Sequence, residues 1–285
     1  MSLLNQFKAQ RDGRPDAAAF LIAAGDRSVP ITWREFARDI EAIAWIIRKY
    51  VPGATIAIIG ANSYEWMTVH AACLFAGAVA LPLEANLSAE DIAGRLSFTG
   101  ARALIHSAAL ADRAHEVKKL LPKLITGGFG TRLTDRMLAL AHKALDAGEP
   151  GIFDLPERDE DETAMLVFTS GTTSRPRGAE LTLRGLRTFS DYWHANLHFA
   201  PGQRTLMLLP LNHIFGICVT YTMLAHGVAL GVCPDFRRIY EAVERFRADF
   251  LFLVPALAEL LADKIAQKGR TVEEAGLSLR WIVVG

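Results

Sequence analysis

The stretch Met165-Leu-Val-Phe-Thr-Ser-Gly-Thr-Thr-Ser-Arg-Pro-Arg-Gly178 joins an apolar run to a loop rich in hydroxyl groups, glycine and arginine. The four apolar residues at its start predict a buried strand. No acidic residue follows until after Ala179, and hydroxyls, backbone N–H groups and arginines are the groups that bind a polyanion. We therefore predict a strand that opens into a phosphate-binding loop.

The spacing of the glycines in this loop excludes a Walker A motif, in which four residues separate the glycines and Lys and Ser or Thr follow. Here six residues separate Gly171 and Gly178, and Ala179 follows. From Thr169 to Arg187 the chain carries four arginines and one glutamate, which favours an anionic ligand. A Ser/Thr-rich surface turn that binds nothing is the alternative, because these residues are common in turns. A predicted strand before the loop and a predicted helix after it favour binding, because they place the loop at the carboxyl end of a strand, where open α/β sheets bind ligands.

Short apolar runs alternate with amphipathic stretches along the chain, which is typical of an α/β fold with largely parallel sheets. Thr32 and Glu35 form a capping-box pattern, and Asn62 or Ser63 is predicted to cap the next helix. Gly127 to Gly130 form a predicted turn cluster. The predicted strands are residues 29–32, 55–60, 79–82, 103–106, 165–168, 206–211, 228–232, 250–254 and 279–284, and the predicted helices are residues 33–50, 64–76, 88–99, 134–147, 181–197, 236–246 and 256–268.

The composition, 51% hydrophobic and 22% charged residues among 285, is typical of a soluble globular protein with one large domain or two smaller ones. Basic and acidic residues number 31 each, so the chain is neutral and no basic stripe points to nucleic acid. Cys73, Cys218 and Cys233 lie in apolar surroundings and are predicted to be buried thiols in a reducing compartment, not a disulfide frame or metal site. The N-terminus lacks the apolar core of a signal peptide, so we expect a cytoplasmic protein.

One uncharged stretch, Thr205 to Pro234, is long enough to require a membrane test. It has 30 residues without a charge, and about 20 predominantly apolar residues suffice to span a bilayer. Pro210, Gly216 and Gly227 interrupt it. We therefore predict a buried strand, a turn, a helix and a second strand, and no transmembrane segment.

Two histidines on the helix predicted after the loop raise the question of a metal site. His194 and His198 are four residues apart and could share a helix face. No acid accompanies them in the spacing of a metalloprotease, so an ordinary half-buried pair is the favoured interpretation.

The loop resembles the signature Thr-Ser-Gly-Thr-Thr-Gly-X-Pro-Lys-Gly of the adenylate-forming enzymes, which include acyl-CoA synthetases, luciferases and the adenylation domains of peptide synthetases. Ser174 stands where this family has Gly, Arg177 where it has Lys, and Leu183 where many members have His. The resemblance continues in the family's order over nearly the whole chain. Five further segments carry it: Ile31-Thr-Trp-Arg-Glu-Phe36, residues 56–66 with Asn62-Ser63 and Glu65-Trp66, Gly77-Ala-Val-Ala-Leu-Pro-Leu83, Leu209-Pro-Leu-Asn-His-Ile-Phe-Gly216 and Phe252-Leu-Val-Pro-Ala-Leu257.

The resemblance implies the two-lobed N-terminal domain of these enzymes, each lobe a mainly parallel sheet flanked by helices. Residues 54–201 would form the first lobe with the phosphate loop, and residues 202–285 with 1–53 part of the second. The family's Mg²⁺-binding Glu and its catalytic Lys lie in sequence beyond the position of Gly285. We therefore expect no catalytic residue and no metal ligand in this chain, which has the extent of an N-terminal fragment that is inactive alone.

The family's chemistry assigns roles by resemblance. ATP and a carboxylate form an acyl-adenylate and pyrophosphate, and a thiol, often that of coenzyme A, then takes the acyl group; the intact enzyme would use ATP, Mg²⁺ and coenzyme A. Arg177 would replace the lysine that steadies the leaving pyrophosphate, although Arg and Lys are not equivalent. The β- and γ-phosphates would be held by Thr169, Ser170, Gly171, Thr172, Thr173, Ser174, Arg177 and Gly178.

A second set of residues is implied for the acyl or adenylate pocket: His213, Phe215 and Gly216. The alternative for His213 is a helix-capping or core histidine. The apolar residues from Ile214 to Leu224 could border an acyl tunnel, but the favoured interpretation is that they belong to the core.

These observations leave three functions open. The first is ATP-dependent adenylation of a fatty or aromatic acid followed by thioester formation, in a protein whose partners would be its own C-terminal region and a second copy of itself in a homodimer. The second is a non-catalytic nucleotide-binding or interaction module derived from the family. The third is an acyl-AMP ligase that passes the acyl group to a carrier protein.

Overall fold

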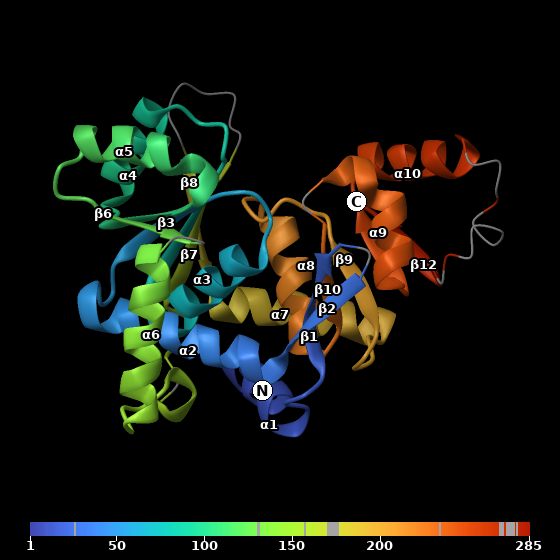
Figure 1. Ribbon diagram of the computed structural model, residues 1–285, viewed down its shortest axis with the longest axis horizontal. Coiled ribbons are helices and arrows are strands. Elements are labelled where there is room, and N and C mark those ends of the chain that lie inside the picture. The colour runs from blue at the N-terminus through green and yellow to red at the C-terminus, as the bar shows by residue number, and fades with distance from the viewer. Residues whose placement is uncertain are drawn as a thin grey trace. The chain divides into compact units, whose positions relative to one another are not determined.

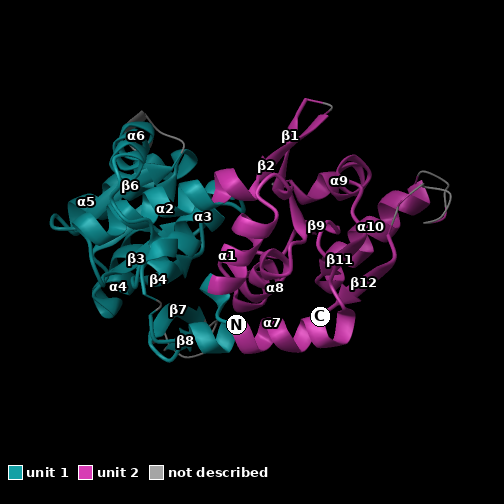
Figure 2. Cartoon of the chain, turned by 90° about the horizontal axis from the view of Figure 1, so that it is seen from below, with its two compact units in different colours: residues 1–4, 37–186 teal, residues 5–36, 187–285 magenta. Residues whose placement is uncertain are grey.

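The computed structural model of the protein describes residues 1–25, 27–129, 132–156, 158–169, 177–233, 235–267, 271, 277 and 279–285. They divide into two compact units, one of residues 1–4 with 37–186 and the other of residues 5–36 with 187–285 (Figure 2). Helices α1 (Leu3–Gly13), α2 (Trp33–Tyr50) and α7 (Leu183–Leu197) each contribute residues to both units. The lobes predicted at 54–201 and at 202–285 with 1–53 stay a prediction.

The described part of the first unit contains a six-stranded sheet in the order β6-β5-β3-β4-β7-β8. All neighbouring strands are parallel except β7 and β8, which are antiparallel. Figure 1 shows α4 and α5 on one side of this sheet and α3 on the other. The bounds are β3 Thr55–Ile59, β4 Val79–Leu83, β5 Ala103–Ser107, β6 Ile125–Phe129, β7 Thr163–Thr169, β8 Arg177–Thr182, α3 Tyr64–Phe75, α4 Ala89–Thr99, α5 Ala111–Leu120 and α6 Arg132–Asp146.

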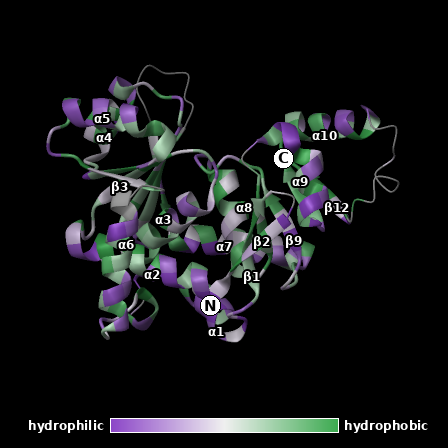
Figure 3. Cartoon of the chain, in the orientation of Figure 1, coloured by the Kyte–Doolittle hydropathy of each residue, from purple (hydrophilic) through white to green (hydrophobic). Residues whose placement is uncertain are grey.

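The strands at the centre of this sheet are buried because helices cover them. The apolar side chains of β3, β4 and β5 pack against α4 and α5 in one core cluster that includes Ile59, Leu83, Ile92, Leu104 and Val117. Burial on both faces explains why these strands are continuous apolar runs without alternation. In Figure 3, α6 has hydrophobic and hydrophilic residues along its length, as expected for a helix with one face in water.

The second unit contains the sheet β2-β1-β10-β9 and the parallel pair β11-β12. The N–H of Asp249 donates to the carbonyl of Arg204, and Thr205 Oγ1 donates to the carbonyl of Phe250, so β11 lies next to β9. Helices α9 and α10 pack on residues of β1, β9, β10 and β11. The bounds are β1 Ala18–Ala24, β2 Arg27–Thr32, β9 Arg204–Met207, β10 Ala229–Val232, β11 Phe250–Leu253, β12 Trp281–Val284, α8 Ile214–Ala225, α9 Ile239–Phe246 and α10 Pro255–Gln267.

The predicted α/β fold of mainly parallel sheets flanked by helices is confirmed. So are both predicted helix starts: Thr32 and Glu35 exchange the two hydrogen bonds of a capping box, and Ser63 accepts from the N–H of Trp66. None of the described helices is long and apolar enough to cross a membrane; the helix within the uncharged stretch, α8, has 12 residues.

Two local predictions are wrong. The predicted turn cluster contributes Gly127 and Gly128 to β6, where a Cβ on Gly127 would lie 3.2 Å from the Cδ1 of Ile105 on the neighbouring strand, so this glycine serves close packing. The helix predicted from Leu181 begins at Leu183, because residues 177–182 form the edge strand β8 and Thr182 Oγ1 accepts from the N–H of Gly185. Pairing with β7 stabilises a strand that has no apolar alternation of its own.

Candidate functional site

The predicted phosphate loop joins the two strands of the β7–β8 hairpin at the carboxyl end of β7. The last two pairs of the hairpin are Phe168 with Gly178 and Thr169 with Arg177. Residues 170–176, and with them the predicted ligands Ser170, Gly171, Thr172, Thr173 and Ser174, lie outside the described residues, as do the side chains of Thr169 and Arg177. The structure therefore places the two ends of the loop at the carboxyl end of β7, and open α/β sheets bind ligands outside the carboxyl ends of their strands.

Two side chains of α4 lie close to Phe168, at the end of β7 where the predicted phosphate loop begins. The guanidinium carbon of Arg95 lies 4.9 Å from the centre of the Phe168 ring, in a cation–π arrangement. Phe98, 66% exposed, lies 6.2 Å from the same ring. Sequence reasoning missed both residues, since α4 precedes the loop by more than 70 residues and carries no part of the signature.

The residues predicted to line an acyl or adenylate pocket lie together at the start of α8, in the second unit. His213 is exposed, occupies the N-cap position and makes no side-chain cap hydrogen bond, so neither the core nor the capping alternative describes its side chain. Phe215 is half-buried, and a Cβ on Gly285 would lie 3.5 Å from its ring. Phe215 therefore lies close to the carboxyl end of β12.

Gly216 has a structural reason to be glycine. A Cβ there would lie 2.2 Å from the carbonyl oxygen of Pro210 and 3.1 Å from that of Leu209, both backbone atoms. Only a residue without a side chain lets the first turn of α8 come this close to the segment that follows β9. Gly216 thus allows the first turn of α8, which carries Phe215, to pack directly on the backbone of Leu209 and Pro210.

A family model described as AMP-binding enzyme matches residues 7–285 of the chain. The chain belongs to the AMP-binding enzyme family. This confirms the resemblance on which the predicted site residues rest, while their individual roles stay predictions.

The chain is similar to acyl-CoA ligases and spans less than half of their length. It is 28% identical over 267 residues to the long-chain-fatty-acid–CoA ligase FadD15 of Mycobacterium bovis, with 89% of this chain and 43% of that protein covered. It is 30% identical over 237 residues to a feruloyl-CoA synthase of an Amycolatopsis species, with 81% and 45% covered.

Solved structures share the fold over the whole chain. The inhibitor-bound N-terminal domain of FACL13 from Mycobacterium tuberculosis has a TM-score of 0.82 at 20% identity, with 100% of this chain and 69% of that chain covered. The nonribosomal peptide synthetase FmoA3 in its AMPPNP-bound form has a TM-score of 0.80 at 23% identity, with 99% and 28% covered.

The positive charge counted around the predicted phosphate loop is partly neutralised in the structure. Arg184 Nη2 lies 2.8 Å from an oxygen of Asp161, and Arg187 Nη1 lies 3.1 Å from an oxygen of Asp191. The hydrogen bond from Arg184 lowers the pKa of Asp161, so this pair is ionised at neutral pH. Of the four arginines between Thr169 and Arg187, these two hold other parts of the fold.

His194 and His198 do not share a helix face, because only His194 lies in α7. His198 follows the end of α7 with a φ of 52°, in the left-handed region. His194 instead stacks on His226, with ring centres 3.8 Å apart and planes within 5°, and Ser190 Oγ lies 3.2 Å from His226 Nε2. Burial, and to a smaller extent the neighbouring His194, lower the pKa of His226 to about 4, so His226 is neutral at physiological pH.

The uncharged helix α8 and the cysteines belong to the core. Every residue from Gly216 to Ala225 is buried, as the core interpretation of this segment predicts. The three cysteines are also buried, and burial raises the pKa of the Cys73 and Cys218 thiols to about 12.

Proposed function

We propose that this chain supplies the ATP-phosphate loop of an AMP-forming acid–thiol ligase of the acyl-CoA synthetase type. The observation that carries the proposal is the near-complete signature at residues 169–178, set at the carboxyl end of β7 in a chain that belongs to the AMP-binding enzyme family. In this reaction a carboxylate attacks the α-phosphorus of ATP, pyrophosphate leaves, and the thiol of coenzyme A takes the acyl group from the adenylate.

The loop contributes positioning and electrostatics. Ser170, Thr172 and Thr173 donate hydroxyl hydrogen bonds to the β- and γ-phosphates, and Gly171 lets the backbone approach them. Arg177 would neutralise the charge that builds up on the departing pyrophosphate, and its guanidinium offers a planar set of donors where the family signature has a lysine. The remaining loop residues other than Pro176 would supply backbone N–H groups.

The acid would be received near the start of α8. His213 is an exposed donor, Phe215 an apolar surface and Gly216 the residue that permits their placement. The similar proteins named for long-chain fatty acids and for a feruloyl group make a fatty or aromatic acid the substrate to test first. Mg²⁺ would enter with ATP and shield its charge; within the described ranges no group of three or more His, Cys, Asp and Glu side chains could hold a metal ion.

Three departures from the family signature, at Leu183, Ser174 and Arg177, favour a second function, and the structure describes the side chain of the first. Leu183, where many members have a histidine, is 4% exposed and packs at the start of α7. An imidazole is therefore replaced by a core residue, which together with Ser174 and Arg177 favours a module that binds the nucleotide without adenylating an acid.

Calorimetric titration of the chain with MgATP tests the proposal. We expect Arg177→Ala to weaken ATP binding by about tenfold to a hundredfold, because a hydrogen bond to a charged group contributes roughly 1.5–3 kcal/mol. The matched control is Arg237→Ala, whose exposed guanidinium is already paired with Asp235 in the second unit, and it should change the affinity by less than about twofold. Absence of binding, or equal affinity of wild type and Arg177→Ala, would contradict the proposal.

Carboxylate-dependent exchange of pyrophosphate into ATP separates the two functions. We expect no exchange from these 285 residues alone, and exchange by them would refute the assignment of the catalytic lysine to later sequence. In a longer form of the protein, exchange with a fatty or aromatic acid supports the ligase. ATP binding without exchange across both acid classes supports the nucleotide-binding module.

A further inference from the structure

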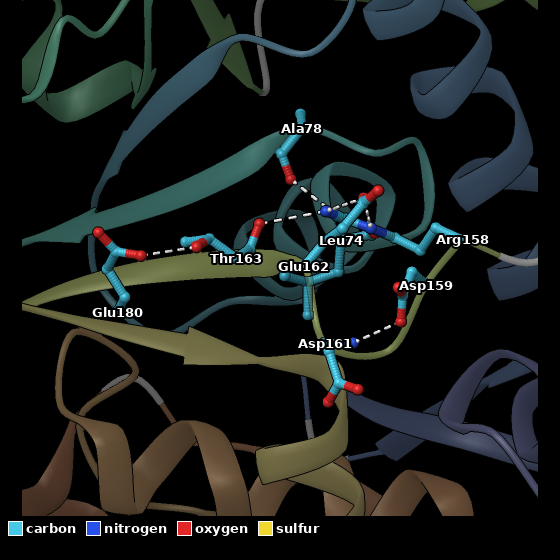
Figure 4. Close-up of polar contacts among 8 residues, drawn as sticks. All are labelled: Leu74, Ala78, Arg158, Asp159, Asp161, Glu162, Thr163 and Glu180. Carbon is cyan, nitrogen blue, oxygen red and sulfur yellow. Dashed lines mark hydrogen bonds and ion pairs between the residues drawn. The ribbon is translucent and has the colours of Figure 1, made fainter.

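One half-buried arginine at the base of the β7–β8 hairpin, Arg158, uses all of its N–H donors. A guanidinium has five N–H groups. In Arg158, Nη1 donates to the carbonyls of Leu74 (3.1 Å) and Ala78 (3.3 Å), and Nη2 donates to the carbonyl of Thr163 (3.1 Å) and to the Glu162 carboxylate (3.0 Å). Nε donates to the same carboxylate at 3.3 Å, and the side chain is 12% exposed (Figure 4).

These bonds tie the start of β7 to the end of α3 and to the beginning of β4, where the bonded residues lie 84 and 80 positions before Arg158 in the chain. Leu74 lies in the last turn of α3, where carbonyls have no partner within the helix and a cation is favoured by the helix dipole. Ala78 directly precedes β4, and Thr163 is the first residue of β7. One side chain therefore fixes the beginning of β7 to the beginning of β4 and to the end of α3.

The place at which Arg158 holds β7 is irregular. The pairing of β7 with β8 shifts between Thr163 and Met165, as in a β-bulge. A bulge leaves a residue outside the regular ladder and re-aims the strand. Arg158 donates to the Thr163 carbonyl at this point. It therefore helps to fix the orientation of the part of β7 that follows the bulge.

Further polar contacts hold the other side of the hairpin base. Thr163 Oγ1 lies 2.7 Å from an oxygen of Glu180 on β8, joining the two strands (Figure 4). The N–H of Arg184, in the first turn of α7, donates to the carbonyl of Glu160, and its guanidinium pairs with Asp161. The chain entering the hairpin and the chain leaving it are thus both anchored within a few residues of Arg158.

We propose that Arg158 is a positioning residue for ATP: by fixing the base of β7 against α3 and β4, it sets where the far end of the hairpin presents the triphosphate-binding groups. This rests on the proposed function of the loop. From Thr163 to Thr169 the strand extends about 20 Å, so a tilt of roughly 5° at its base moves its far end by about 2 Å. Displacements of about 1 Å at reacting groups can cost up to about a hundredfold in rate.

The test compares Arg158→Gln and Arg158→Lys with Arg113→Gln. Arg113 is a matched control, because it also donates to a backbone carbonyl of the first unit, that of Ala85, but is not part of the hairpin. Affinities for MgATP and AMP are measured well below the thermal midpoint of each variant, and hydrogen exchange is followed in peptides covering β5, β6, β7 and β8.

We expect Arg158→Gln to weaken ATP binding about tenfold more than Arg113→Gln does, with AMP affinity unchanged because AMP lacks the β- and γ-phosphates. Arg158→Lys keeps the charge but lacks the planar five-donor fork, so its ATP affinity should lie between those of wild type and Arg158→Gln. Exchange should rise in β7 and β8 and stay unchanged in β5 and β6.

Three results would overturn the proposal. Parallel losses of ATP and AMP affinity, or equal losses in the Arg158 and Arg113 variants, would show that Arg158 only stabilises the fold. A uniform rise of exchange in all four strands would do the same. If wild type binds no ATP, the proposed function fails, and the exchange pattern still decides whether Arg158 anchors the hairpin specifically.

Discussion

Replacing Gly216 by alanine tests the close approach that shapes the start of α8. In a helix this change is normally favourable by about 0.5–1 kcal/mol, because alanine has the higher helix propensity. At Gly216 the added Cβ would lie 2.2 Å from the Pro210 carbonyl oxygen and 2.9 Å from its carbonyl carbon. Ordinary contacts need well over 3 Å, so the backbone of α8 or of the preceding segment must move by about 1 Å.

The expected effect follows from these opposing terms. Overpacking a close-packed site typically costs about 1–3 kcal/mol and occasionally more, and a clash with backbone lies at the upper end of that range. Subtracting the propensity gain of up to about 1 kcal/mol leaves a loss of roughly 2 kcal/mol in the free energy of unfolding. Displacing α8 also displaces His213 and Phe215, so binding of the acid should weaken.

The assay is urea unfolding followed by tryptophan fluorescence, together with hydrogen exchange in a peptide covering α8. The matched control is Gly94→Ala in α4, an exposed helical glycine at which a Cβ would meet nothing within 4 Å. This control should be more stable than wild type by about 0.5–1 kcal/mol. The reasoning is refuted if Gly216→Ala is as stable as wild type or is stabilised to the same extent as the control.

Two further predictions concern stability. The pKa of His226 is lowered to about 4, whereas an unfolded histidine titrates near 6.5, so the unfolded chain binds the extra proton and stability present above about pH 6.5 is lost as the pH falls toward about 4. His226→Gln should reduce the difference between the urea midpoints measured at about pH 7.5 and about pH 5. The part that remains is due to His70, whose pKa burial lowers to about 3. An unchanged difference would contradict a role of His226 in the pH dependence. Thr32→Ala removes the hydroxyl that accepts from the N–H of Glu35 at 3.2 Å and should cost about 1 kcal/mol in the free energy of unfolding, whereas Thr32→Ser, which keeps the hydroxyl, should cost less than half of that; equal losses would contradict a capping role.

Much of the fold could be predicted because the relevant signals are local. The central strands β3, β4 and β5 appear as short apolar runs, and burial on both faces makes such runs continuous. The capping residues Thr32 and Ser63 mark helix starts because their side chains bond to N–H groups three residues later. Where a residue's hydrogen-bond partners lie within one helical turn along the chain, the residue type and the spacing are sufficient to predict the structure.

The wrong predictions have the opposite character. Edge strand β8 reads Arg-Gly-Ala-Glu-Leu-Thr, without apolar alternation, and it is a strand because β7 offers it a hydrogen-bonding edge. Gly127 suggested a turn, yet it serves close packing against Ile105. His194 stacks on His226, which lies 32 positions later in the chain. No periodic sequence pattern connects residues at that separation.

By itself, the sequence determined the α/β class, most helices and strands, and membership of the AMP-binding enzyme family through the signature at residues 169–178. Only the tertiary structure decided that the ends of this loop close an antiparallel hairpin, that Arg184 is held by Asp161, and that Arg158 joins α3, β4 and β7. The physical reason is the range of the interactions involved. Propensities, caps and motifs act between neighbours along the chain, whereas strand pairing and buried hydrogen bonds join residues that only the complete fold brings together.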